Sequence, residues 1–292
     1  MIPGSASGIW PTAAGGGAWV QAVIVYNGTV SESALELELL DVAREAAEAA
    51  AAELRPRFGH RQDGVRAKST PTDLVSDADL AAEASIRAVL ADRRPGDTIL
   101  GEEGGQTGDG ELRWLIDPLD GTTNFLFGVP QFAVSVACED AGGGLAGVVL
   151  DPVRDECFSA ARSGRPQLNG AAITASTGDQ LATALVATGF GYNSRVRARQ
   201  AAVLARVLPN VRDIRRAGSA ALDLSWCACG RYDAYFERGV KPWDYAAGSL
   251  IASRAGLELR ELPAAGDDDP KGLLAAPAPL ADELLALILG RT

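Results

Sequence analysis

The chain has 292 residues, 47% of them hydrophobic, and a formal net charge of −11. That length suits one large domain or two fused halves, and the excess of acidic residues argues against binding along a nucleic-acid backbone. The only histidine is His60, so a Ser-His-Asp triad, a histidine nucleophile and a histidine-rich metal site all have little support. Carboxylates, hydroxyls and bound ions must therefore carry any reaction.

The first thirty residues differ in composition from the rest of the chain. They are rich in Gly, Pro and Ser, and we predict that residues 1–30 form a poorly ordered extension. The apolar run Trp19–Tyr26 is too short to span a membrane, and no basic residue precedes Arg44, so we expect neither a membrane segment nor a signal peptide. The four cysteines are too few for a disulfide framework, which favours a reduced, cytoplasmic protein.

Helical spacing of apolar residues after residue 30 predicts a long helix from Ser31 or Ser33 to about Arg55, and a second helix from Ser76 or Asp77 to about Leu90. Apolar runs then predict a group of strands, with a hairpin at Gly142–Gly144. These strands are Thr98–Leu100, Trp114–Ile116, Phe132–Glu139, Leu145–Asp151 and Glu156–Ala161. The first half, about residues 31–180, should consist of helices packed on a largely antiparallel sheet.

In the second half, about residues 181–290, strands alternate with helices, a pattern typical of a layered α/β structure. The expected strands are Ala184–Thr188, Val211–Ile214 and Ala234–Glu237, and the expected helices are Arg195–Leu208, Ser219–Cys229 and Trp243–Ala255. Gly256 has the place of a helix C-cap. Taken together, residues 31–290 are predicted to form one domain of two halves.

Acidic residues stand at the ends of three predicted elements. Asp117 and Asp120 follow an apolar run and precede a Gly-Thr-Thr turn, Glu102 follows another apolar run, and Asp244 begins a helix. Carboxylates bind hard cations, and free N–H groups at a helix start bind phosphate. This spacing favours a metal-dependent phosphate site, although Glu102 alone could be a surface acid and Asp244 a plain N-cap.

The motifs Gly101-Glu102-Glu103, Asp117-Pro118-Leu119-Asp120-Gly121-Thr122-Thr123-Asn124-Phe125 and Trp243-Asp244 resemble those of the inositol monophosphatase family. The resemblance covers nearly all of the chain from about Leu35. It implies a five-layer αβαβα sandwich of the inositol monophosphatase and fructose-1,6-bisphosphatase type, an α/β (α+β) fold. It also implies hydrolysis of a phosphate monoester by water activated on two or three Mg²⁺ ions, with sensitivity to lithium.

The resemblance also implies roles for individual residues. One ion should be held by Glu102, Asp117 and the carbonyl of Leu119. A second should be held by Asp117, Asp120 and Asp244, and a weaker third ion should be shared by Glu102. Thr122 and Glu102 should orient the attacking water, with Asp79 hydrogen-bonded to Thr122. The N–H groups of Gly121 and Thr122 should bind phosphate oxygens. Substrate hydroxyls should meet Glu237 and the loop at Gly218, Ser219 and Ala220, and Lys68 should support the site.

Several alternatives stay open at this point. Lys68 could be a plain surface lysine, and Glu237 an acid at a strand end. The substrate could be inositol 1-phosphate, fructose 1,6-bisphosphate or histidinol phosphate. A protein of another class could retain the fold as a regulator or scaffold. We expect a small phosphorylated polyol or sugar as the partner, no nucleic acid and no membrane, and the resemblance suggests a homodimer.

Overall fold

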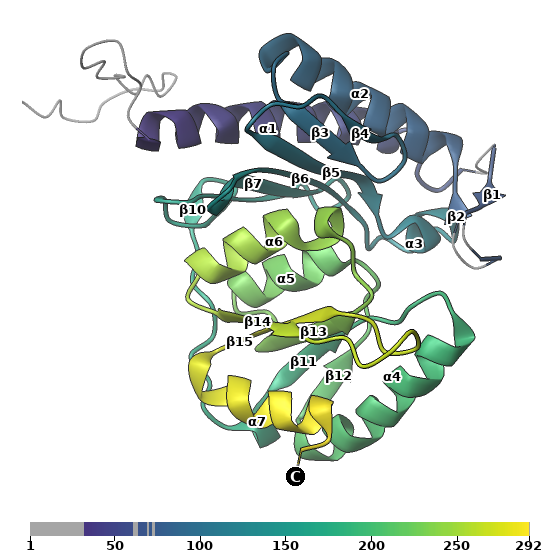
Figure 1. The fold of residues 1–292 in the computed structure, drawn as a ribbon, viewed down its shortest axis with the longest axis vertical. Helices are drawn as coiled ribbons and strands as arrows, with labels where there is room; N and C mark the ends of the chain where they lie inside the picture. Colours follow the sequence, from purple (N-terminus) through teal and green to yellow (C-terminus); the bar gives the residue numbers. More distant parts are fainter. Residues whose placement is uncertain (1–31, 61–63, 69, 72–73, 292) are drawn as a thin grey trace, which may run out of the picture.

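The computed structural model describes residues 32–60, 64–68, 70–71 and 74–291, so the predicted extension at residues 1–30 lies outside them. The described chain forms five layers of alternating helices and sheets (Figure 1). The helices are α1 (Glu32–Leu54), α2 (Asp77–Arg93), α3 (Thr122–Leu126), α4 (Ser194–Val207), α5 (Ala220–Ala228), α6 (Pro242–Arg254) and α7 (Ala278–Leu289).

The first sheet has eight strands in the order β10-β9-β8-β7-β6-β5-β3-β4. They are β3 (Thr98–Gly101), β4 (Gly105–Thr107), β5 (Arg113–Asp120), β6 (Ala133–Asp140), β7 (Gly143–Asp151), β8 (Glu156–Ala161), β9 (Gln167–Leu168) and β10 (Ala171–Ala172). All neighbours are antiparallel except β3 and β5. The prediction of a largely antiparallel sheet in the first half is therefore confirmed.

The second sheet has five strands in the order β12-β11-β13-β15-β14. They are β11 (Leu185–Thr188), β12 (Asp213–Arg215), β13 (Ala234–Arg238), β14 (Glu258–Leu262) and β15 (Gly272–Ala276). β11 is parallel to β12 and β13, whereas β15 is antiparallel to β13 and β14. A separate two-stranded ribbon pairs β1 (Arg66–Ala67) with β2 (Leu74–Val75).

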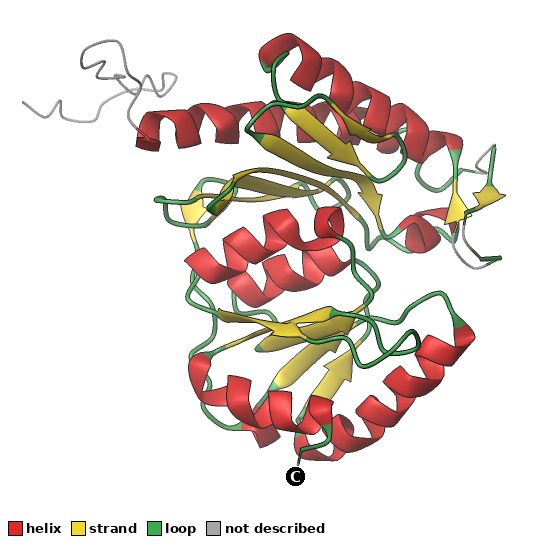
Figure 2. Cartoon of the chain, in the orientation of Figure 1, coloured by secondary structure: helices red, strands yellow, loops and turns green. Residues whose placement is uncertain are grey.

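Three hydrophobic cores hold the five layers together. The first lies between α1, α2 and the eight-stranded sheet, the second surrounds α5 and α6 between the two sheets, and the third lies between the five-stranded sheet, α4 and α7. Figure 2 shows the resulting alternation of helical and sheet layers. The five-layer αβαβα prediction is thus confirmed.

Burial explains why each helix lies where it does. In α1, the buried positions Leu39, Val42, Ala46 and Ala50 recur at helical spacing, so the helix covers the sheet with one face. In α5, eight of the nine residues are buried, as befits a helix placed between two sheets. None of the described helices is both long and apolar enough to cross a bilayer.

The predicted elements are found with two notable differences. The strand expected at Val211–Ile214 begins later, because the 3-10 turn Leu208–Asn210 delays pairing until Asp213. The sequence pattern predicts no element after residue 256, yet the chain there forms β14, β15 and α7. All four cysteines are free, as expected.

Candidate active site

A cavity of about 640 Å³ lies between the two halves, and the predicted site residues surround it. Its wall includes the acidic residues predicted from the motifs, namely Glu102, Asp117, Asp120, Asp244 and Glu237. The first three come from the eight-stranded sheet and the loop after β3, whereas Asp244 lies in the first turn of α6 and Glu237 near the end of β13. The fold therefore brings together acids that lie more than 100 residues apart in the sequence.

Strand β5 brings two of these carboxylates to the cavity because its pairing is irregular near its end. Its pairing with β6 shifts register between Asp117 and Asp120, which places both side chains near the cavity. Asp117 is buried, and its Oδ1 accepts a hydrogen bond from the Leu119 N–H at 3.0 Å. Burial, followed by the nearby charge of Glu102, raises the pKa of Asp117 well above its usual value.

Asp120 and Asp244 are fixed by hydrogen-bond donors from the second half. Asp120 Oδ2 accepts from the Ser219 hydroxyl at 2.6 Å and from the Ala221 N–H at 2.7 Å. Burial raises the pKa of Asp120 to about 6, against the opposing effect of those hydrogen bonds. Asp244 Oδ2 accepts from the Lys241 N–H at 2.7 Å, and burial and the charge of Asp120 raise its pKa well above normal.

Glu102 belongs to a short loop that a buried acid on α2 holds in place. The two carboxylate oxygens of Glu83 accept the Glu103 and Gly104 N–H groups, each at 2.8 Å, and Arg87 pairs with Glu83 at 2.7 Å. Sequence reasoning placed Glu83 on the helix without a role. Its position one turn after Asp79, on the same face of α2, was the available signal.

Lys68 lies over this loop and pairs with both of its acids. Its Nζ is 2.7 Å from Glu102 Oε1 and also contacts Glu103. Burial disfavours the ammonium form, but the two carboxylates outweigh burial and raise the pKa of Lys68. Burial raises the pKa of Glu103 to about 7 despite the bond from Lys68. Lys68 is therefore not a free surface lysine.

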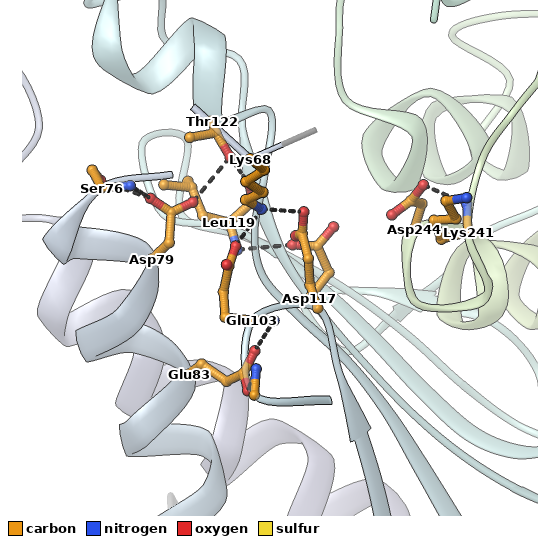
Figure 3. Close-up of polar contacts among 12 residues, drawn as sticks. Lys68, Ser76, Asp79, Glu83, Glu103, Asp117, Leu119, Thr122, Lys241 and Asp244 are labelled. Carbon is orange, nitrogen blue, oxygen red and sulfur yellow. Dashed lines mark hydrogen bonds and ion pairs between the residues drawn. The ribbon is translucent and has the colours of Figure 1, made fainter. Parts of the chain in front are cut away.

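Thr122 and Asp79 are in direct contact, as the family resemblance implied. The Thr122 hydroxyl lies 3.0 Å from Asp79 Oδ1 and 3.1 Å from the Leu119 carbonyl, so it can donate its proton to either. Asp79 is fully buried and accepts from both the N–H and the hydroxyl of Ser76. Burial raises the pKa of Asp79. Figure 3 shows Thr122, Asp79 and Lys68 on one side and Asp244 on the other.

Three of the four predicted substrate residues, Gly218, Ala220 and Glu237, line the same cavity. Gly218 and Ala220 line its wall, whereas Ser219 is buried and its hydroxyl donates to Asp120 and caps α5. Ser219 therefore stabilises a carboxylate in this structure rather than facing the cavity. Glu237 accepts a hydrogen bond from the Tyr235 hydroxyl at 3.0 Å, and burial raises its pKa to about 7.

An arginine that sequence reasoning missed lies close to Glu237. Arg216 lines the cavity, and its guanidinium stands 5.8 Å from the centre of the Phe190 ring. The dipeptide Arg215-Arg216, directly before the loop predicted to line the substrate, was the signal in the sequence. Beside the cluster of acids, the cavity wall thus includes Glu237, a cation and an aromatic ring.

The donor set has the chemistry of a magnesium site, with oxygen ligands only. Within the described residues, however, no group of three or more His, Cys, Asp or Glu side chains is arranged as a ready metal site. The carboxylates are turned toward hydrogen-bond donors, namely Lys68, the Ser219 hydroxyl and the Lys241 N–H. Burial and the charges of neighbouring acids raise the pKa values of Asp117 and Asp244 in spite of such donors, and the residues fit a cation by charge and type.

Comparison with known proteins supports the family assignment. The profile of the inositol monophosphatase family matches residues 36–289. The inositol-1-monophosphatase SuhB of Mycobacterium tuberculosis is 47% identical over 243 residues, covering 80% of this chain and 83% of that protein. The Nus factor SuhB of Pasteurella multocida is 39% identical over 221 residues, covering 75% and 83%.

Solved structures agree with this result. The crystal structure of the extragenic suppressor protein suhB from Bartonella henselae has a TM-score of 0.80 and 34% identity, and the match covers 87% of this chain and 99% of that one. Fold, motifs and relatives all point the same way: this chain belongs to the inositol monophosphatase family.

Proposed function

We propose that the protein is a Mg²⁺-dependent phosphatase that hydrolyses phosphate monoesters of small polyols, with inositol 1-phosphate as the leading substrate. The observation that carries the proposal is the convergence of Glu102, Asp117, Asp120 and Asp244 on one cavity. Their crowding and burial raise the pKa of three of them. A cluster of buried acids is costly without a compensating cation, and a phosphate ester needs one in order to approach the cluster.

The proposed ligands are those that membership of the inositol monophosphatase family implies. Glu102, Asp117 and the Leu119 carbonyl would hold one ion, Asp117, Asp120 and Asp244 a second, and Glu102 would share a third. When bound, the ions would acidify a water molecule and neutralise the departing oxygen. A metal ion at Glu102 would compete with the Lys68 ammonium, which contacts the same carboxylate.

The remaining residues of this end would orient the reacting groups. Thr122, held by Asp79, would direct the attacking water together with Glu102. Gly121 and Thr122 stand at the start of α3, where N–H groups have no helical acceptor and can bind phosphate oxygens. Lys68 would hold the loop of Glu102 and Glu103 in place, a supporting role.

Recognition of the leaving group would take place at the other end of the cavity. Glu237 can accept two hydroxyl hydrogens, a pattern that suits a polyol ring. Gly218 and Ala220 offer a wall without long side chains. Arg216 favours one alternative, because a guanidinium at this end could bind the second phosphate of a bisphosphate such as fructose 1,6-bisphosphate. Histidinol phosphate is a third candidate.

A second candidate function is a role that does not depend on catalysis. The relative from Pasteurella multocida bears the name Nus factor SuhB, whereas the mycobacterial relative bears the name of an enzyme. Retention of the whole acidic set favours catalysis in this chain. It leaves room for a regulatory or scaffold role beside it.

The test is phosphate release from inositol 1-phosphate, with and without Mg²⁺, beside fructose 1,6-bisphosphate and histidinol phosphate. Fast release from inositol 1-phosphate that depends on Mg²⁺ would support both the chemistry and the substrate. Preference for another ester would keep the chemistry and reassign the end of the cavity at Glu237. Absence of release from all three would favour the non-catalytic role.

A further inference from the structure

Beside the cavity, a loop from each half of the protein meets a loop from the other half. We call residues 120–124 the phosphate loop and residues 216–220 the polyol loop. Gly121 has φ +101°, and a Cβ atom at this position would lie 2.9 Å from the Gln131 carbonyl oxygen and 3.2 Å from the Gly218 carbonyl oxygen. The first distance is shorter than a Cβ tolerates and the second is tighter than an ordinary contact, so the backbone of the phosphate loop lies close to Gln131 and to the polyol loop.

The side chain of Asn124 joins the same segments. Its amide nitrogen donates to the Gln131 carbonyl at 2.6 Å and to the Ala217 carbonyl at 2.9 Å, and lies 3.4 Å from the Gly218 carbonyl. Three carbonyl oxygens around one group require the amide nitrogen there and not the amide oxygen. Asn124 therefore binds the polyol loop to α3 and to the start of β6.

The polyol loop has one further anchor in the first half. Asp120 accepts the Ser219 hydroxyl and the Ala221 N–H, which fixes the start of α5. Between these anchors lie Gly218 and Ala220, both in the cavity wall. The position of that wall relative to the phosphate loop thus depends on Asp120 at one end and on Asn124 at the other.

We propose that Asn124 is a positioning residue that sets substrate specificity by holding the polyol loop at a fixed place relative to the phosphate loop. It acts through Ala217 and Gly218, because its own side chain does not line the cavity. The part that concerns specificity rests on the proposed phosphatase function, whereas the part that concerns loop position does not. A displacement of about 1 Å in a positioning contact can cost about a hundredfold in rate.

The first test compares two substrates that share the phosphate and differ in the leaving group. For wild type, Asn124→Asp and Asn124→Ala, we would measure kcat/KM with inositol 1-phosphate and with para-nitrophenyl phosphate, which has no hydroxyl ring. Asn124→Asp keeps the shape but turns an acceptor toward the carbonyl oxygens. The ratio of the two kcat/KM values should fall by about tenfold to a hundredfold in both variants.

Asn210→Ala is the matched control. Asn210 also donates its amide to a carbonyl, that of Arg206 at 2.8 Å, but it lies on the surface away from the cavity. Its substitution should leave the ratio unchanged. An equal loss for both substrates in the Asn124 variants would overturn the proposal, since that is the result of general destabilisation.

The second test does not depend on activity. Amide hydrogen exchange at Ala221 and Leu222, whose N–H groups bond to Asp120 and Ser219, should become faster in the Asn124 variants. Exchange at Cys157, whose N–H bonds to Asn169 Oδ1 outside both loops, should not change. Unchanged exchange at Ala221 and Leu222, the residues that directly follow the polyol loop, would overturn the positioning role. If wild type hydrolysed neither substrate, the proposed function would fail, and exchange would still decide the role of Asn124.

Discussion

A single methyl group added at Gly121 should separate the cost of its backbone conformation from the cost of the contact between the loops. Gly121→Ala places a Cβ at φ +101°, where an L-residue loses about 1–2 kcal/mol. The same Cβ lies 2.9 Å from the Gln131 carbonyl oxygen, and relief of such overpacking costs about 1–3 kcal/mol more. Gly256 is a close control, because it has φ +107° and a Cβ atom added there would have no other atom within 4 Å.

The assay is urea unfolding of Gly121→Ala and Gly256→Ala under identical conditions. In both variants, the free energy of unfolding should fall by the cost of placing alanine at a positive φ. In Gly121→Ala it should fall by about 1–3 kcal/mol more than in Gly256→Ala. Gly121→Ala should also lose phosphatase activity, because the phosphate loop must shift to admit the methyl group. Equal losses of unfolding free energy in the two variants would show that neither Gln131 nor the polyol loop packs tightly against Gly121.

Further predictions concern the acids of the cavity. Asp117→Asn should lower turnover by orders of magnitude in a phosphate-release assay, because it removes a charged metal ligand. Asp155→Asn, which changes an exposed acid, should leave turnover unchanged. Near-normal turnover in Asp117→Asn would contradict the assignment. Chelation of Mg²⁺ should abolish activity and millimolar lithium should inhibit it, and indifference to lithium would count against the proposal. Burial raises the pKa of Glu237 to about 7 from about 4.5, so the native state keeps a proton that the unfolded chain loses. In the presence of a chelator, the free energy of unfolding should therefore fall as pH rises from about 4.5 to about 7. Glu237→Gln should reduce this dependence on pH, and an unchanged dependence would disprove the prediction.

Much of the fold could be predicted because the pattern of apolar residues repeats the geometry of each element. The run before Asp117 is buried on both faces within the sheet, and α1 shows clear helical spacing. The region after residue 256 was harder. β14 has only one buried residue of five and so lacks the alternation that marks a half-buried strand, since it is an edge strand of its sheet.

The candidate site was predicted by residue type, and of its contacts only that between Asp79 and Thr122 was expected, from the family resemblance. The acids could be named from the motifs, since they follow apolar runs. The partner of Ser219 could not be predicted, because its hydrogen bond to Asp120 joins residues 99 apart in the sequence and depends on how the halves pack. The same holds for Asn124 and for Lys68, whose partners lie across loops. Motifs identify the candidate groups, and tertiary packing decides which of them touch.

The burial of α5 on every side has a consequence for how the protein comes apart. Residues of α5 such as Leu222 and Cys227 belong to the core shared by both sheets, so neither sheet can cover that helix alone. Separation of the halves would expose this apolar layer to water, at a free-energy cost that neither half could recover. We therefore expect residues 32–291 to melt as one cooperative unit in calorimetry, and a chain cut near residue 180 to yield two fragments that aggregate when expressed separately.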